Sequence, residues 1–127
     1  MELKRDIENR EDLHNVLSLF YQNLLADPSI GYIFTDVAKI DMEHHLPVIT
    51  DFWETVLFHT GSYEKNAIVP HLVLNSKTPL LKSHFDTWLM HFGNAVDLLF
   101  EGERSIQIKQ HATSIATIMQ IKIRQTN

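Results

Sequence analysis

Cysteine is absent from the 127 residues of the sequence. This absence excludes disulfide bonds, thiolate metal sites and a cysteine nucleophile, so thiols give no information on the redox compartment. Glycine-rich phosphate-binding loops and the Gly-x-Ser-x-Gly motif of serine hydrolases are absent too. Two common routes to nucleotide binding and nucleophilic catalysis are therefore excluded.

Long apolar runs and clusters of basic residues are also missing. No run approaches the roughly 18 residues that a membrane-spanning helix needs, and the N-terminal "MELKRDIENRED" lacks the apolar core of a signal peptide. The 11 Lys and Arg residues are dispersed and the formal net charge is −5, which argues against nucleic-acid binding. We therefore expect a cytoplasmic protein that neither enters membranes nor binds nucleic acid.

The composition is that of an ordinary globular protein with many histidines. Hydrophobic residues make up 44% of the chain and charged residues 21%. A chain of this length forms one core, so we expect a single domain over residues 1–127. Eight histidines against four glycines is an unusual ratio. It directs attention to metals because imidazole is a common metal ligand.

Apolar residues at helical spacing predict two helices in the first half of the chain. The first is capped by Asn9 or Asp12 and ends at "DPSIG", about four turns later. The second runs from about Asp41 to about His59, and Pro47 implies that it either starts later or bends there. The "GYIF" between them is too short for more than one helical turn.

The second half of the chain predicts further helices and no credible pair of strands. Residues 61–77 mix turn residues with a short apolar run, which indicates a loop carrying one or two turns of helix. Thr78 as cap and Pro79 as first helical residue open the next helix, which stops at Gly102. The helical pattern then continues to the C-terminus. The predicted fold class is all-α.

The stretch "IVPHLVLN" at residues 68–75 places His71 in an apolar segment. Burying an imidazole without a partner costs roughly 1–3 kcal/mol, so the ring needs a hydrogen-bond partner or a metal. A backbone carbonyl is the commoner partner. A metal site of side chains alone needs several ligands, and paired-histidine motifs are absent. Haem iron needs only one protein ligand because the porphyrin supplies four.

Three more polar side chains lie on the apolar faces of predicted helices. Tyr21 lies on the first helix, His45 on the second and Trp88 on the helix that stops at Gly102. Each alone is more often a core residue whose polar end meets a carbonyl. Together with His71, they are consistent with a pocket that has one iron ligand and several distal hydrogen-bond donors.

Two polar clusters do not predict a site. The "SHFD" at residues 83–86 contains Ser83, His84 and Asp86, but neighbours in sequence do not make a catalytic triad. We interpret this cluster as solvated helix surface. The "EHH" at residues 43–45 cannot chelate a metal, because consecutive helical residues diverge by about 100°.

Most of the chain, from about Ile7 to Met119, resembles the group III truncated haemoglobins of bacteria. The stretch that carries the resemblance is "HLPVITDFWETVLFHTGSYEKNAIVPHLVLN" from His45 to Asn75. It is preceded by "LFYQNLLADPSIGYIF" and followed by "HFDTWLMHFGNAVDLLF". The "HLP" and "DFW" blocks occur in the family's order, with a histidine at the expected later place.

The resemblance implies a two-over-two α-helical globin sandwich around haem b, an iron cofactor. His71 matches the family's proximal iron ligand, and Trp88 matches its distal tryptophan. Tyr21 matches its distal tyrosine and His45 its distal histidine. The remaining positions expected to contact the cofactor are Phe20, Phe34, Ile49, Phe52 and Trp53.

Two departures from the family pattern affect the surroundings of this site. Family members commonly carry a basic residue immediately before the proximal histidine, where this chain has Pro70. One expected contact to a haem propionate is thereby removed. Phe58 and His59 replace a more usual Leu-Gly, which affects the turn after the second helix.

The expected function is binding of O2, NO or CO to haem. Tyr21 and Trp88 would donate hydrogen bonds to the ligand, and His45 would gate the pocket. The resemblance implies ligand chemistry such as nitric oxide dioxygenation or peroxide-type redox turnover, with a reductase as a possible partner. The alternative is a cofactor-free helical protein-interaction domain in which all these residues belong to the core.

Overall fold

The computed structural model describes residues 3–61 and 68–126, and the regular elements in these ranges are all helical. They are α1 (Arg10–Ala26), η1 (Ile33–Val37), α2 (Met42–Phe58), α3 (Ile68–Lys77), α4 (Lys82–Leu99) and α5 (Glu103–Thr126). The predicted all-α class is therefore confirmed. None of the described helices is both long and apolar enough to cross a membrane.

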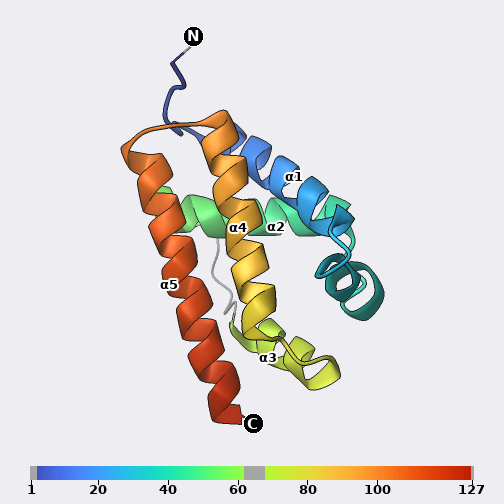
Figure 1. Cartoon of the computed structure of the whole chain (residues 1–127). Coiled ribbons are helices and arrows are strands. Elements are labelled where there is room, and N and C mark those ends of the chain that lie inside the picture. Colours follow the sequence, from blue (N-terminus) through green and yellow to red (C-terminus); the bar gives the residue numbers. More distant parts are fainter. Residues whose placement is uncertain (1–2, 62–67, 127) are drawn as a thin grey trace.

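Four of the helices form two packed pairs. Helix α1 contacts α2 within one pair, and α4 contacts α5 within the other. The pairs meet where α1 crosses α4 and where α2 meets α5 (Figure 1). Helix α3 lies near the N-terminal end of α4 and contacts α5.

The main core lies where the two pairs meet, and α1 supplies much of it. Its residues Leu13, Val16, Leu17, Phe20 and Leu24 recur every three or four positions and are all buried. They pack against Trp53 of α2 and Phe92 and Val96 of α4. Full burial of side chains of this size contributes roughly 1.5–3 kcal/mol each, so this seam dominates the packing energy.

Helix caps agree with the sequence at the start of α1 and α2. The Asn9 side chain accepts a hydrogen bond from the Asp12 N–H, and the Asp41 side chain accepts one from the Glu43 N–H. Helix α2 therefore begins before Pro47, and the alternative of a later start is wrong. Pro47 lies inside the helix and cannot donate the backbone hydrogen bond of that position.

Helix α3 is longer than one or two turns, because it spans ten residues, Ile68–Lys77. The expected helix of one or two turns was therefore too short. The loop predicted before it lies in part outside the described residues. Pro70 is the third residue of the helix. A proline is tolerated in a first turn, where backbone N–H groups have no partner within the helix.

Helix α4 begins at Lys82, so the predicted start at Thr78 and Pro79 is wrong. The Thr78 N–H donates to the Leu74 carbonyl, and the Leu80 N–H donates to the Asn75 side chain. These bonds hold residues 78–81 in a tight connection to α3. The N-terminus of α4 is capped instead by His84, whose Nδ1 accepts a hydrogen bond from the Leu81 N–H at 3.0 Å.

The N-terminal segment fixes the start of α5 through Asp6. Its carboxylate accepts hydrogen bonds from the Arg104 and Ser105 N–H groups at 2.8 and 2.9 Å, which suits the positive end of a helix. Gly102 has a φ of 147°, and a Cβ there would lie 2.5 Å from the Asp6 Cγ. Glycine is therefore required at this close approach.

Candidate functional site

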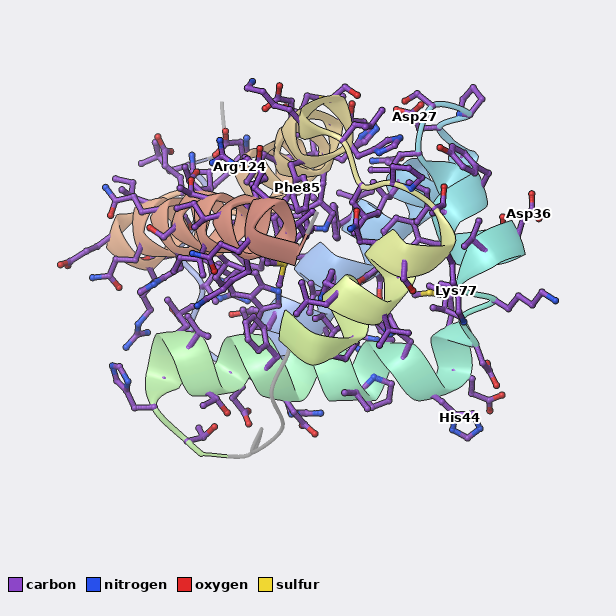
Figure 2. The ribbon with its side chains drawn as sticks, turned by 90° about the horizontal axis from the view of Figure 1, so that it is seen from below. Asp27, Asp36, His44, Lys77, Phe85 and Arg124 are labelled. Carbon is purple, nitrogen blue, oxygen red and sulfur yellow. The ribbon has the colours of Figure 1, made fainter. Side chains whose placement is uncertain are left out.

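A cavity of about 450 Å³ lies between the helices, with mostly apolar walls. The volume falls in the range of about 300–1,000 Å³ that is usual for ligand and cofactor sites. Figure 2 looks toward it past α3, with α2 along one side and α5 on the other. Its polar lining consists of a few side chains: Tyr21, His45, His71, His84 and Trp88.

Tyr21 and His45 are joined by a hydrogen bond. The Tyr21 hydroxyl lies 2.8 Å from His45 Nε2, and the rings meet edge to face. Burial raises the pKa of the Tyr21 hydroxyl well above its usual value, so the group keeps its proton at neutral pH. Burial, and then the nearby charge of His71, lowers the pKa of His45. The pair is therefore neutral and can carry a hydrogen bond in either direction.

His71 reaches the same cavity from α3. It lies in the first half of the helix, directly after Pro70, and its side chain is half-buried. His71 and His45 line the same cavity from different helices. Within residues 3–61 and 68–126, no three His, Cys, Asp or Glu residues converge to hold a metal ion by themselves. A metal at His71 would therefore need ligands from a cofactor.

Trp88 completes the polar set from the α4 side. Its ring stacks on Phe92 with 5.6 Å between ring centroids, and Phe92 stacks in turn on Trp53 at 4.9 Å. These contacts fix the plane of the Trp88 indole. The side chain is half-buried and lines the cavity, so α4 contributes an aromatic wall with one potential donor.

The apolar positions predicted to contact a cofactor mostly come together. Phe34, Ile49, Phe52 and Trp53 line the cavity. Phe20 lies behind this wall, because it is 1% exposed and packs edge to face against Trp88 at 5.7 Å. It supports the cavity wall through Trp88 and Tyr21.

Sequence reasoning missed one polar residue and the contribution of α5. His84 is half-buried and lines the cavity, so its interpretation as solvated surface is wrong, whereas Ser83 and Asp86 are exposed. From α5, Ile115 and Met119 close the wall. Their helical spacing was visible, but spacing alone does not distinguish a core face from a cavity face. His44 points away from the fold into solvent (Figure 2), as the divergence of consecutive helical residues predicts.

Comparison with known proteins agrees with this geometry. Group 3 truncated hemoglobin ctb of Campylobacter jejuni is 26% identical over 121 residues, which cover 93% of each chain. The crystal structure of a group III truncated hemoglobin from Campylobacter jejuni matches with a TM-score of 0.83 at 25% identity over 95% of each chain. The chain has the truncated haemoglobin fold. No protein-family model matches the sequence.

The predicted resemblance to group III truncated haemoglobins is thus confirmed. The two packed pairs, α1 with α2 and α4 with α5, are the sandwich expected of such a truncated globin. The similarity to haemoglobins supports haem binding, and the residues present fit a haem group. A flat apolar macrocycle suits the apolar walls, and a single imidazole on α3 suits an iron that already has four ligands.

The two departures from the family pattern have visible consequences in this truncated haemoglobin fold. Pro70 is exposed and has no polar side-chain atom, so it offers no donor near His71. His59 ends α2 in the left-handed conformation, with φ 59° and ψ 36°. The chain therefore makes the left-handed turn at the end of α2 with a histidine, although glycine adopts this conformation at lower energetic cost.

Proposed function

We propose that the protein is a haem-binding globin that holds haem b through His71. One observation carries the proposal: a single apolar cavity contains both His71 and the hydrogen-bonded pair of Tyr21 and His45. Similarity to truncated haemoglobins along nearly the whole chain supports the same cofactor. The haem would supply an iron that binds O2, NO or CO and polarises the bound ligand.

Tyr21 would stabilise the ligand through its hydroxyl proton. When His45 Nε2 carries its own proton, it donates to the Tyr21 oxygen and leaves the Tyr21 O–H free for the ligand. Trp88 would supply a second donor from its indole N–H. A hydrogen bond to a charged partner contributes roughly 1.5–3 kcal/mol, about twice the value for neutral partners, so the more polarised ligand gains more.

His45 would also act as a gate. Its ring is half-buried and hydrogen-bonded to the Tyr21 hydroxyl. Rotation about two side-chain torsions would exchange this bond for contact with water and open a path to the cavity. Each opening of the proposed gate would therefore break one hydrogen bond, at a free-energy cost on the order of 0.5–1.5 kcal/mol.

Retention of O2 suits nitric oxide dioxygenation. In this reaction O2, NO and one electron combine to nitrate; the haem would supply the electron and a reductase would return it. Two neutral donors near the ligand, Tyr21 and Trp88, support this choice over simple transport, because they slow the escape of a polarised ligand.

Peroxide-type turnover is a second candidate, and the state of His45 favours it. Since burial lowers the pKa of His45, the ring is neutral at neutral pH and can accept a proton from hydrogen peroxide. His45→Ala separates the two candidates. Peroxide consumption should fall in this variant, whereas nitrate formation from NO and O2 should be largely retained.

Haem uptake tests the proposed function directly. Purified protein should show an intense Soret band or acquire one on addition of haemin, in one-to-one ratio. His71→Gly should lose most of this haem and regain it with added imidazole, which replaces the missing ring. His44→Ala is the matched control, because His44 is on the surface of α2 and should keep full haem content. Undiminished haem in His71→Gly would exclude the assigned ligand, and a colourless protein would favour a cofactor-free interaction domain.

A further inference from the structure

His84 lines the cavity but has no part in the function proposed above. It belongs to the first turn of α4 and is half-buried. Its ring contacts the Leu81 backbone N–H through one nitrogen and the Tyr32 hydroxyl through the other. These two contacts decide where its proton lies.

The backbone fixes the tautomer of His84. Because the Leu81 N–H donates to Nδ1 at 3.0 Å, Nδ1 carries no proton and the neutral ring is protonated on Nε2. Nε2 lies 3.3 Å from the Tyr32 hydroxyl oxygen and therefore donates to it. The Tyr32 O–H proton then remains available for another acceptor. The result is a chain of donors that starts at the Leu81 backbone, passes through His84 of the cavity lining and ends at the hydroxyl of the partly exposed Tyr32.

We propose that Tyr32, with its hydroxyl oxygen held by His84, binds one of the two propionate carboxylates of haem. This inference rests on the proposed function and specifies how the anionic edge of the cofactor is held. A carboxylate only accepts hydrogen bonds. The His84 Nε2–H is used on the Tyr32 oxygen, so the donor that this pair presents is the Tyr32 O–H, where two segments far apart in the sequence meet.

The rest of the lining favours this assignment. Tyr21 and His45 are bonded to each other, and Pro70 offers no donor beside His71. Tyr32 is 39% exposed, so a carboxylate beside it would keep contact with water. That contact reduces the cost of burying a charge and allows a neutral donor to replace a basic side chain.

A pair of variants at His84 tests the inference without removing the helix cap. His84→Gln and His84→Glu each keep an oxygen that can accept from the Leu81 N–H, as in a capping box. Only His84→Glu adds a negative charge beside the carboxylate. We expect equal thermal midpoints but haem loss to an excess of scavenging apoglobin about tenfold faster or more in His84→Glu, since close like charges repel strongly.

Haem dimethyl ester provides the control for the partner group. Its carboxylates are esterified and carry no charge. The ratio of the loss rate in His84→Glu to that in His84→Gln should therefore fall to near one. A ratio near one with ordinary haem, or the same ratio with the ester, would overturn the inference. If wild-type protein takes up neither cofactor, the proposed function and the inference both fail, whereas uptake with no difference between the variants refutes the inference alone.

Tyr32→Phe tests the donor itself independently of His84. The ring stays and only the hydroxyl is lost from a side chain that is partly exposed, so the thermal midpoint should not change. Loss of ordinary haem should become about two- to tenfold faster, the range for one neutral hydrogen bond. Loss of the dimethyl ester should be nearly unchanged. Equal rates for wild type and Tyr32→Phe with ordinary haem would remove Tyr32 from the site.

Discussion

Tyr21 and His45 share one hydrogen bond, and this bond decides which of the two can meet a ligand. The His45 Nε2 is held 2.8 Å from the Tyr21 oxygen, so this ring nitrogen already has a partner. Tyr21 is buried, with 5% of its surface exposed, and it lines the cavity together with His45. When His45 donates to the Tyr21 oxygen, the Tyr21 O–H is the group of this pair that can donate to a ligand.

Removal of either proposed donor should release O2 faster than CO. Tyr21→Phe deletes the hydroxyl and Trp88→Phe deletes the indole N–H, while both keep an aromatic ring. Because a charge-assisted hydrogen bond contributes roughly 1.5–3 kcal/mol, each variant should raise the O2 dissociation rate by about tenfold or more. CO is less polarised, so its rate should change much less. Stopped-flow displacement measures both rates, and O2 release at the wild-type rate in both variants would refute the proposed donors.

The hydrogen bond between Tyr21 and His45 also predicts the coordination number of the iron in the haem-bound protein. Since Tyr21 holds His45 Nε2, we expect ferrous haem to be five-coordinate and high-spin, with His71 as its one protein ligand. Optical and resonance Raman spectra distinguish this state from a low-spin one. A low-spin spectrum that disappears in His45→Ala but persists in His44→Ala would show that His45 binds the metal.

Among the helices, α2 ends in a conformation that its sequence does not favour. His59 is left-handed and donates its N–H to the Thr55 carbonyl at 3.0 Å. A side chain with a Cβ pays roughly 1–2 kcal/mol in this region, and glycine adopts it freely. The α2 terminus is therefore a site of stored strain.

His59→Gly should relieve this strain and stabilise the protein. The expected gain is about 0.5–1 kcal/mol, because glycine also loses more entropy on folding. His44→Gly is the matched control, since the same substitution within the first turns of α2 should destabilise by roughly 0.5–1 kcal/mol. Urea unfolding at equal haem content measures both values. A loss of stability in His59→Gly would contradict the proposed strain.

The start of α4 shows where local helix rules fail. Thr78 and Pro79 form a good start sequence, yet the amides of Thr78 and Leu80 bond to residues of α3. Bonds to another element overrode the local preference, and such bonds cannot be read from one segment. The Asn9 cap and a helix start near Asp41 were predictable because caps act within three residues of themselves.

Across the whole molecule, three aspartates act as anions that hold segments of the chain together, two of them across distant parts of the sequence. Asp12 forms a paired contact with the Arg5 guanidinium at 2.6 and 2.7 Å, and this contact lowers the pKa of Asp12. The His91 hydrogen bond, together with bonds from Ser29, lowers the pKa of Asp27 to about 2. Burial alone would raise the pKa of Asp6, but hydrogen bonds from Arg104 and Ser105 lower it.

These lowered pKa values predict acid sensitivity of folding. A group whose pKa is lower in the folded state adds stability above its unfolded pKa and loses it as pH falls through the folded value. Stability should therefore decrease from about pH 5 toward pH 2, the value for Asp27. Asp12→Asn should cost about 1.5–3 kcal/mol at pH 7, and its deficit should shrink as the pH is lowered. Thermal unfolding at equal haem content measures this, and a deficit independent of pH would contradict it.

The fold was more predictable than the site. Helical periodicity indicated α1, α2 and α5, since their apolar positions report directly on one buried face. The cavity was only partly predictable, because Ile115 and Met119 have the same spacing as core residues. His84 lay beyond sequence reasoning, since its role depends on Leu81 and Tyr32 together. The roles of the site residues and the single domain over residues 1–127 stay predictions.

Trp53 and Trp88 are the two tryptophans of the chain, and both line the cavity. Their fluorescence emission should therefore depend on what occupies the cavity. A haem group beside them would absorb their excitation energy and quench the fluorescence of the whole protein. Titration of the emission against added haemin should thus yield the stoichiometry without any external label, and the spectral shift of the unquenched protein should report how much water enters between α2 and α4.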